Sequence, residues 1–205
     1  MNTDEVLQAL VLVCSLRPSP AASSSQLLGQ QVLDELEQYN VQGSMIRAVD
    51  YDIKPGVETD MGDGDAWPDI RRQMLEADIL IIATPIWLGH TCSVAQRIME
   101  RLDAELSETD DQGRLMMYGK VAAVAVVGNE DGAHNVCADL FQGLNDVGFT
   151  LPAAVGTYWV GEAMQKVDYK DLKETPEMVA TANKSLAANV AHLARLLKNN
   201  PYPAV

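Results

Sequence analysis

The sequence predicts an α/β domain of the doubly wound type, in which helices cover both faces of a five-stranded parallel sheet. Five short apolar runs are spread along the chain, and an amphipathic stretch of helical period follows each of them. None of the runs alternates cleanly between apolar and polar residues, which is typical of strands buried on both faces of a parallel sheet. We therefore expect five parallel strands in the spatial order 2-1-3-4-5.

The expected strands and helices alternate along the whole chain. The five strands are 7–14, 44–49, 79–84, 121–127 and the weaker 149–156. The five helices are 25–39, 68–77, 92–105, 132–147 and 177–198. Pro68 suits the first turn of a helix, and Gly148 suits the end of one.

The length of the chain predicts one domain. Its 205 residues are enough for one substantial hydrophobic core and short for two, so we expect a single domain over residues 1–205. Acidic residues stand near the start, where a signal peptide needs basic ones, and no apolar run approaches the roughly 20 residues of a membrane span. These features predict a cytoplasmic protein without a membrane partner.

The charge of the chain excludes several classes of partner. With 29 acidic and 15 basic residues, its net charge of −14 repels nucleic acid and anionic membranes. Any phosphate site must therefore be locally free of acids. The three cysteines are widely spaced without a CxxC pair, so we expect neither a disulfide framework nor a zinc site. The run DMGDGD at 60–65 lacks the spacing of a calcium loop, which predicts a solvated acidic loop and no metal.

Ligands of doubly wound sheets bind beyond the carboxyl ends of the strands, where the strand order reverses. The reversal lies here between the first and third strands, and the first strand is followed by the loop SLRPSPAASSS at 15–25. Hydroxyls, an arginine and the start of a helix all offer donors to a phosphate, and no acid occurs from 6 to 33. The loop therefore predicts a phosphate site, without a GxGxxG or GxxxxGK[ST] fingerprint. A flexible serine loop with a helix cap is the alternative interpretation.

The loops after the third and fourth strands face the same edge of the sheet. The segment TPIWLGH at 84–90 offers an aromatic face, a rigid proline and a glycine, in a stretch without acids from 79 to 99. These features suit a flat ring such as an isoalloxazine, although Trp87 alone suits an ordinary loop anchor equally well. The segment GNEDGAH at 128–134 directs its amides to the same place, and its acids also suit the start of a helix.

Three segments together resemble the NADPH-dependent FMN reductase branch of the flavodoxin-like superfamily. They are CSLRPSPAASSSQLL, ADILIIATPIWLGHTCSVAQRIMERLD and VVGNEDGAHNVCADLFQGLNDVGFTLP, and their order and spacing extend the resemblance over residues 6–160. The resemblance implies a flavodoxin-like fold, noncovalently bound FMN, NADPH or NADH as the reductant, and a homodimer or homotetramer. The chain departs from it at Cys14, where many relatives have glycine, and at Asn129-Glu130-Asp131, where many have a glycine pair.

The resemblance also implies which residues bind FMN. The phosphate loop is matched by Ser15, Arg17, Ser23, Ser24 and Ser25. The loop along the ring is matched by Thr84, Pro85, Ile86, Trp87, Leu88 and Gly89, and the loop on its far side by Gly128, Asn129, Glu130, Asp131, Gly132 and His134. The aromatic residues expected to line the substrate pocket are Trp87, Tyr158 and Trp159.

The expected activity is that of an NAD(P)H-dependent reductase, which passes hydride through FMN to a small-molecule acceptor such as a flavin or a quinone. The chemistry then lies at the flavin N5, and no side chain need act as an acid or a base. His90 and His134 are the loop histidines available for a direct role. One alternative is a flavodoxin-type electron carrier between protein partners, without NAD(P)H turnover. Another is a flavin-binding regulator or scaffold.

Overall fold

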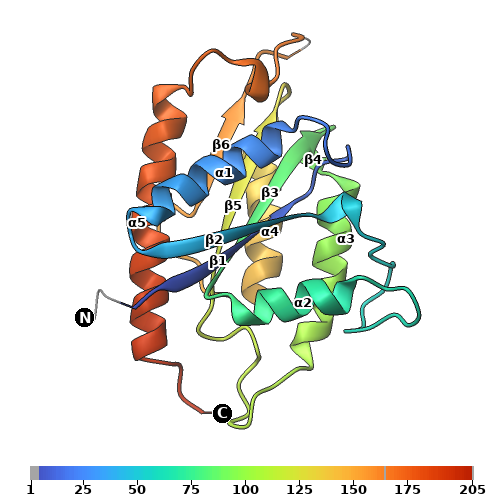
Figure 1. Ribbon diagram of the computed structural model, residues 1–205, viewed down its shortest axis with the longest axis vertical. Helices are drawn as coiled ribbons and strands as arrows, with labels where there is room; N and C mark the ends of the chain where they lie inside the picture. Colours follow the sequence, from blue (N-terminus) through green and yellow to red (C-terminus); the bar gives the residue numbers. More distant parts are fainter. Residues whose placement is uncertain (1–4, 164, 205) are drawn as a thin grey trace.

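The computed structural model describes residues 5–163 and 165–204 and contains the predicted doubly wound sheet (Figure 1). Within these residues, five parallel strands lie in the order β2-β1-β3-β5-β6, and the short β4 pairs with β3 in the antiparallel sense. The strands are β1 (Leu7–Val13), β2 (Val41–Arg47), β3 (Ile79–Trp87), β4 (His90–Thr91), β5 (Val121–Gly128) and β6 (Gly156–Val160). The order of the parallel strands is the predicted one, with its reversal between β1 and β3.

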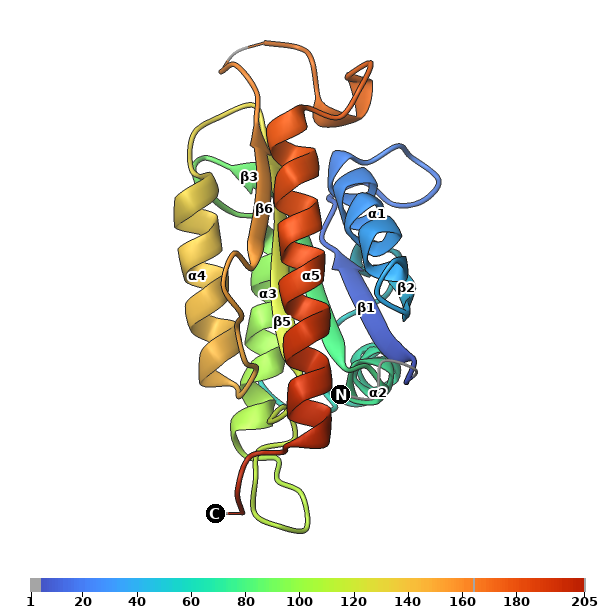
Figure 2. The same cartoon turned by 90° about the vertical axis from the view of Figure 1, so that its left-hand side faces the viewer.

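In the described part of the chain, five α-helices cover the two faces of the sheet (Figures 1 and 2). They are α1 (Ser24–Glu37), α2 (Trp67–Glu76), α3 (Ser93–Leu102), α4 (Ala133–Asp146) and α5 (Glu177–Asn199), with short 3-10 turns at Ala48–Asp50, Asp103–Leu106 and Tyr169–Asp171. Apolar residues of α1 and α5 pack in one core cluster, and those of α2, α3 and α4 in the other. None of these described helices is long and apolar enough to cross a membrane.

The central strands β1, β3 and β5 are buried on both faces along most of their length, which explains why their apolar runs do not alternate in polarity, whereas the edge strand β2 exposes residues 42–44. In β1, Leu10 and Leu12 belong to the cluster with α2, α3 and α4, whereas Val11 and Val13 belong to the cluster with α1 and α5. Successive side chains of a strand point to opposite faces, so a strand covered by helices on both sides favours apolar residues at successive positions.

The fifth parallel strand begins later than predicted. The run 149–156 contributes an isolated bridge at Thr150, and the strand forms as β6 instead. Pro152 has no N–H to donate to a ladder, and Ala154 has a φ of 53°, in the left-handed region that a strand does not accommodate. The predicted bounds of this strand are therefore wrong.

Strand β3 continues past the predicted 79–84 to Trp87 and then turns back into β4. Its last two residues pair with both residues of β4. Between the two strands, Leu88 and Gly89 have φ values of 52° and 76°, and positive φ at both central positions characterises a type I′ hairpin turn. The segment predicted as a loop is therefore largely a β-hairpin at the carboxyl end of β3 (Figure 1).

A buried ion pair holds the acidic loop between β2 and α2. The side chains of Asp65 and Arg101 are both 0% exposed, with an N–O distance of 2.8 Å. Arg101 also donates to the carbonyl oxygens of Lys54 and Glu58, and its guanidinium lies 5.5 Å from the ring centre of Trp67. Burial alone raises the pKa of Asp65, but hydrogen bonds from backbone amides and from Arg101 outweigh it and lower the pKa to about 2. The prediction of a solvated loop is therefore wrong at Asp65.

Candidate functional site

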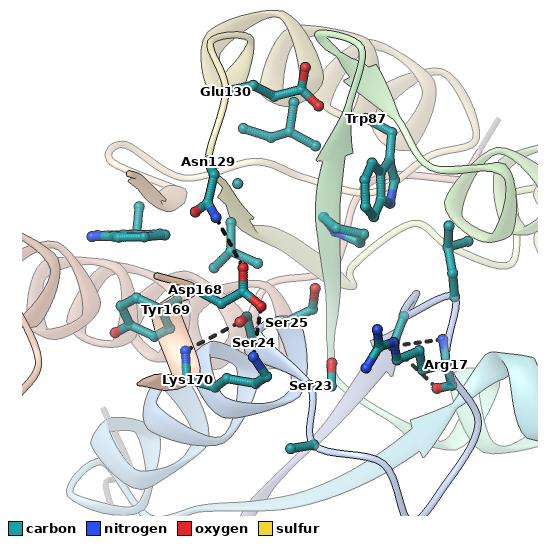
Figure 3. Close-up of a pocket in the computed structure, with 18 of the residues that line it drawn as sticks. Arg17, Ser23, Ser24, Ser25, Trp87, Asn129, Glu130, Asp168, Tyr169 and Lys170 are labelled. Carbon is teal, nitrogen blue, oxygen red and sulfur yellow. Dashed lines mark hydrogen bonds and ion pairs between the residues drawn. The ribbon is translucent and has the colours of Figure 1, made fainter. Parts of the chain in front are cut away.

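A pocket of about 630 Å³ lies beyond the carboxyl ends of β1, β3, β5 and β6, where the strand order reverses (Figure 3). Its volume is in the range of small-molecule and cofactor sites. The three predicted loops form most of its wall, and the segment after β6 completes it. The lining residues are Ser15, Leu16, Arg17, Ala22, Ser23, Ser24, Ser25, Pro85, Ile86, Trp87, Val127, Gly128, Asn129, Glu130, Trp159, Ala163, Gln165, Asp168, Tyr169 and Lys170.

The loop between β1 and α1 is held in place by two residues outside the pocket lining. The buried guanidinium of Arg47 donates to the carbonyl oxygens of Arg17 and Ala21, at 3.3 and 2.7 Å. The carboxylate of Asp50 accepts hydrogen bonds from the amide and the hydroxyl of Ser19, at 2.8 and 2.6 Å, and these bonds lower the pKa of Asp50. The loop is therefore tied to β2 and to the turn after it.

The hydroxyls at the start of α1 are arranged as hydrogen-bond donors. Ser23 caps the helix by accepting a hydrogen bond from the amide of Gln26, and the Ser24 hydroxyl oxygen accepts one from the amide of Lys170, each at 3.2 Å. An accepting hydroxyl keeps its own proton for donation. The amides of Ser24 and Ser25 lie in the first turn, where no helical carbonyl precedes them to accept. Backbone and side chains thus present donors together, and the helix dipole favours an anion at this point.

The side of the pocket opposite this loop is formed by the ends of β3 and β5. Pro85, Ile86 and Trp87 supply apolar and aromatic surface from β3. A Cβ on Gly128 would lie 2.8 Å from the Cβ of Ile86, so the close approach of the two strand ends requires glycine at this position. Just beyond, Glu130 accepts a hydrogen bond from the amide of Leu88 at 2.8 Å. The hairpin and the loop after β5 are therefore joined at the pocket.

The structure brings most of the predicted site residues to the pocket wall. Those that line it are Ser15, Arg17, Ser23, Ser24, Ser25, Pro85, Ile86, Trp87, Gly128, Asn129, Glu130 and Trp159. Their common feature is a position within a few residues of the carboxyl end of a parallel strand or of the start of α1. The topology of the sheet alone is enough to gather them.

Three predicted residues from the β3–β4 region lie outside the lining. Thr84 is fully buried within β3, where its hydroxyl lies 3.4 Å from the sulfur of Cys92. Leu88 and Gly89 form the tip of the hairpin, and the Leu88 residue is 87% exposed. The extension of β3 to Trp87 is the reason, because it carries the tip past the pocket.

Four further predicted residues also lie outside the lining. Asp131 is exposed, and Gly132 packs against the hairpin, where an added Cβ would lie 2.6 Å from the Cα of Gly89. His134 points outward from α4, and its Nε2 lies 3.0 Å from the hydroxyl of Tyr158. Tyr158 and Trp159 are neighbours in β6, so they face opposite sides of the sheet and only Trp159 reaches the pocket.

Sequence reasoning missed one wall of the pocket, which we call the strap and define as residues 165–171. Its Gln165, Asp168, Tyr169 and Lys170 line the pocket. The segment has no apolar periodicity and no motif that marks it. The available signal was positional, since the strap follows a strand whose carboxyl end lies at the ligand-binding edge of the sheet.

The strap is anchored to three other elements. The buried ring of Tyr169 lies 5.5 Å from that of Trp159, and its hydroxyl donates to the side chain of Gln31 at 2.5 Å. The side-chain amide of Asn129 donates to Asp168 at 3.0 Å. With the bond from the Lys170 amide to Ser24, these contacts tie the strap to β6, α1 and the loop after β5 (Figure 3).

The charges of the pocket are balanced, unlike those of the protein. Among the described lining residues, the charged side chains are those of Arg17, Lys170, Glu130 and Asp168. The Lys170 ammonium donates to Asp168 at 2.7 Å and to Asp171 at 2.9 Å, and these hydrogen bonds raise the pKa of Lys170. The pocket thus has two cationic and two anionic groups in a chain whose net charge is −14.

Known proteins resemble this chain in sequence and in fold. An 8-demethyl-8-aminoriboflavin-5'-phosphate synthase from Streptomyces davaonensis is 33% identical over 210 residues, which cover 96% of this chain and 80% of the relative. The crystal structure of RosB with its bound intermediate 8-demethyl-8-formylriboflavin-5'-phosphate superposes with a TM-score of 0.87 at 32% identity, covering 96% of this chain and 82% of that one.

A flavodoxin from the domain Archaea superposes with a TM-score of 0.60 at 11% identity, covering 92% of this chain and 99% of that one. At this identity the match shows the fold alone, which is flavodoxin-like as predicted. The model of the family described as NADPH-dependent FMN reductase matches residues 7–165, which include all the strands of the sheet. The chain therefore belongs to the NADPH-dependent FMN reductase family.

Proposed function

We propose that the pocket binds FMN and that the protein is an NAD(P)H-dependent reductase, which transfers hydride through FMN to a flavin, quinone or similar acceptor. The observation that carries the proposal is the first turn of α1, whose amides and Ser23 and Ser24 hydroxyls are donors beside a loop without acids. A phosphate monoester is a group that such donors bind. FMN and NADPH are the cofactor and the reductant of the family.

The remaining lining fits the other parts of FMN. Pro85, Ile86 and Trp87 would hold one side of the ring, and the backbone from Gly128 to Glu130 the other. The carboxylate of Asp168 is an acceptor suited to the ribityl hydroxyls, which are donors. The hydroxyl-rich start of α1 suits one terminal phosphate, and the sequence has no GxGxxG fingerprint for an adenylate, which favours FMN over a dinucleotide flavin.

The side chains bind and orient, and the cofactor supplies the reactive centre. When bound, FMN supplies a ring that accepts hydride at N5 from a reduced nicotinamide and passes it to an acceptor. Trp87, which is 52% exposed, offers an aromatic surface at the pocket against which a second flat molecule can pack. Glu130 is fixed by the Leu88 amide, and its negative charge disfavours further negative charge on a ring beside it.

The test uses the purified protein with FMN and a reductant. We expect absorbance at roughly 450 nm from bound oxidised flavin. We also expect steady oxidation of NADPH or NADH when a quinone or free flavin is added. A protein that stays colourless after incubation with excess FMN would refute the proposal. Binding of FMN without NADPH or NADH oxidation would instead favour an electron carrier or a regulator.

A second candidate function is modification of the flavin itself. The observation that favours it is the 33% identity over 96% of this chain to a synthase whose product name describes an amino group at flavin C8. In that case the phosphate end of the same pocket holds a flavin phosphate as substrate. Mass spectrometry of the flavin recovered after aerobic incubation with FMN and an amine donor separates the two candidates. Dioxygen supplies the oxidant that loss of the C8 methyl group requires, whereas a reductase returns FMN of unchanged mass.

The assembly of the protein stays a prediction. The exposed Leu88 at the tip of the hairpin, next to the half-exposed Trp87, is a surface on which we propose that a second copy packs in a homodimer or homotetramer. Size-exclusion chromatography with light scattering tests this, with Leu88→Asp expected to shift the protein towards the monomer.

A further inference from the structure

The strap supplies the pocket with a cation that the family match does not cover. The family model ends at residue 165, whereas Lys170 lines the pocket five residues further on. Its amide donates to the hydroxyl oxygen of Ser24, so the backbone of Lys170 lies at the first turn of α1. Figure 3 shows Ser23 between Lys170 and Arg17 in this view.

The ammonium of Lys170 is held in place and still has a donor to offer. Its side chain is 24% exposed, and Asp168 and Asp171 accept from two of its three N–H groups. Asp168 is in turn fixed by the side-chain amide of Asn129. A third N–H therefore remains for a ligand without loss of either ion pair. The raised pKa of Lys170 keeps the group charged.

We propose that Lys170 binds the phosphate of the flavin from the side opposite Arg17, and that it makes the pocket select phosphorylated over unphosphorylated flavin. The inference rests on the proposed function, because it requires FMN at the start of α1. Charge-assisted hydrogen bonds from cationic side chains bind a dianionic phosphate more strongly than neutral donors alone, and Arg17 and Lys170 are the cationic side chains among the described lining residues. The two carboxylates orient the ammonium, while its contact with the phosphate supplies the selectivity.

The test compares FMN with riboflavin, which has the same ring and ribityl chain but no phosphate. Lys170→Met should weaken FMN binding at least tenfold, as expected for a lost charge-assisted hydrogen bond, and change riboflavin binding less than about threefold. Lys173→Met is the matched control, because Lys173 is an exposed lysine outside the pocket lining and its loss changes the net charge equally. It should leave both dissociation constants close to those of the wild type.

A double variant separates contact from net charge. Lys170→Met leaves Asp168 and Asp171 unpaired and thereby adds repulsion towards a phosphate. Lys170→Met combined with Asp171→Asn restores the net charge of the strap, so FMN binding should stay weak if the ammonium touches the phosphate. Wild-type affinity for FMN in the double variant would overturn the inference, as would equal FMN affinity of the Lys170→Met and Lys173→Met proteins.

The outcomes also distinguish this inference from the function on which it rests. If the wild type binds neither FMN nor riboflavin, the proposed function fails and the inference fails with it. If the wild type binds FMN more tightly than riboflavin and Lys170→Met keeps the same ratio, the function stands and the inference alone is wrong. Riboflavin binding by each variant serves as the check that its pocket is folded.

Discussion

Removal of Arg101 should destabilise the fold far more than removal of an exposed arginine. The guanidinium is fully buried, pairs with Asp65 and donates to the carbonyl oxygens of Lys54 and Glu58. Arg101→Met would leave the Asp65 carboxylate buried without its charge partner. Breaking one side of a buried ion pair costs about 3–5 kcal/mol, which corresponds to a Tm lower by roughly 10 °C for a chain of this size.

The assay is urea and thermal unfolding at pH 7, followed by far-ultraviolet circular dichroism. Arg72→Met is the matched control, because Arg72 pairs with Asp69 while their side chains are 63% and 74% exposed. An exposed pair contributes about 0–1 kcal/mol, so the control should lose little stability. Equal losses of unfolding free energy for the two variants would refute the argument that burial makes the Arg101 pair indispensable.

Acid unfolding, FMN binding and the site of the acceptor each give a further prediction. Between pH 4 and pH 2 the wild type should lose about 2 kcal/mol of unfolding free energy that Asp65→Asn does not lose. The pKa of Asp65 is about 2 in the folded protein, below its value in the unfolded chain, so the stabilisation by its carboxylate disappears as the pH falls through this range. Parallel plots of unfolding free energy against pH for the two proteins would contradict this prediction. Ser24→Ala should weaken the binding free energy of FMN by about 1.5–3 kcal/mol, whereas Ser19→Ala, which loses only its hydrogen bond to the turn after β2, should change it little; equal titration curves for the two variants would show that the phosphate does not lie at Ser24. Trp87→Ala should lower kcat/KM for a quinone roughly fivefold, whereas Tyr158→Ala should leave kcat/KM unchanged. A larger loss of kcat/KM in Tyr158→Ala than in Trp87→Ala would show that the acceptor binds on the other face of β6.

The sheet could be predicted from the sequence because its signal is local. Apolar runs of strand length mark residues buried between two helical layers, and the strand order follows from the fold class. The end of β3 was missed because its last two residues depend on pairing with β4, and Pro85 within that stretch argues against a strand. The late start of β6 follows from Pro152 and Ala154. The proline can be recognised in the sequence, whereas the positive φ of Ala154 is visible only in the structure.

The candidate site was predictable where it lies next to a strand end, and not where it depends on contacts between distant residues. Lys170 meets Ser24 across 146 residues of sequence, and Tyr169 meets Gln31 across 138. No local pattern encodes such pairs. The separation of Tyr158 from Trp159 is different, because neighbours in a strand face opposite sides and the alternation alone implies that one of them leaves the pocket.

The three tryptophans of the chain occupy two environments, which gives the protein a built-in optical reporter. Trp87 and Trp159 line the pocket, whereas Trp67 is fully buried beneath Arg101. An oxidised flavin absorbs at the wavelengths where indole emits, and energy transfer between them falls steeply with distance. Emission from the pocket pair should therefore be quenched more than that of Trp67 when a flavin enters, whereas local unfolding around Trp67 exposes its indole to water and shifts its emission to longer wavelength. One emission spectrum then records occupancy and local unfolding as separate signals.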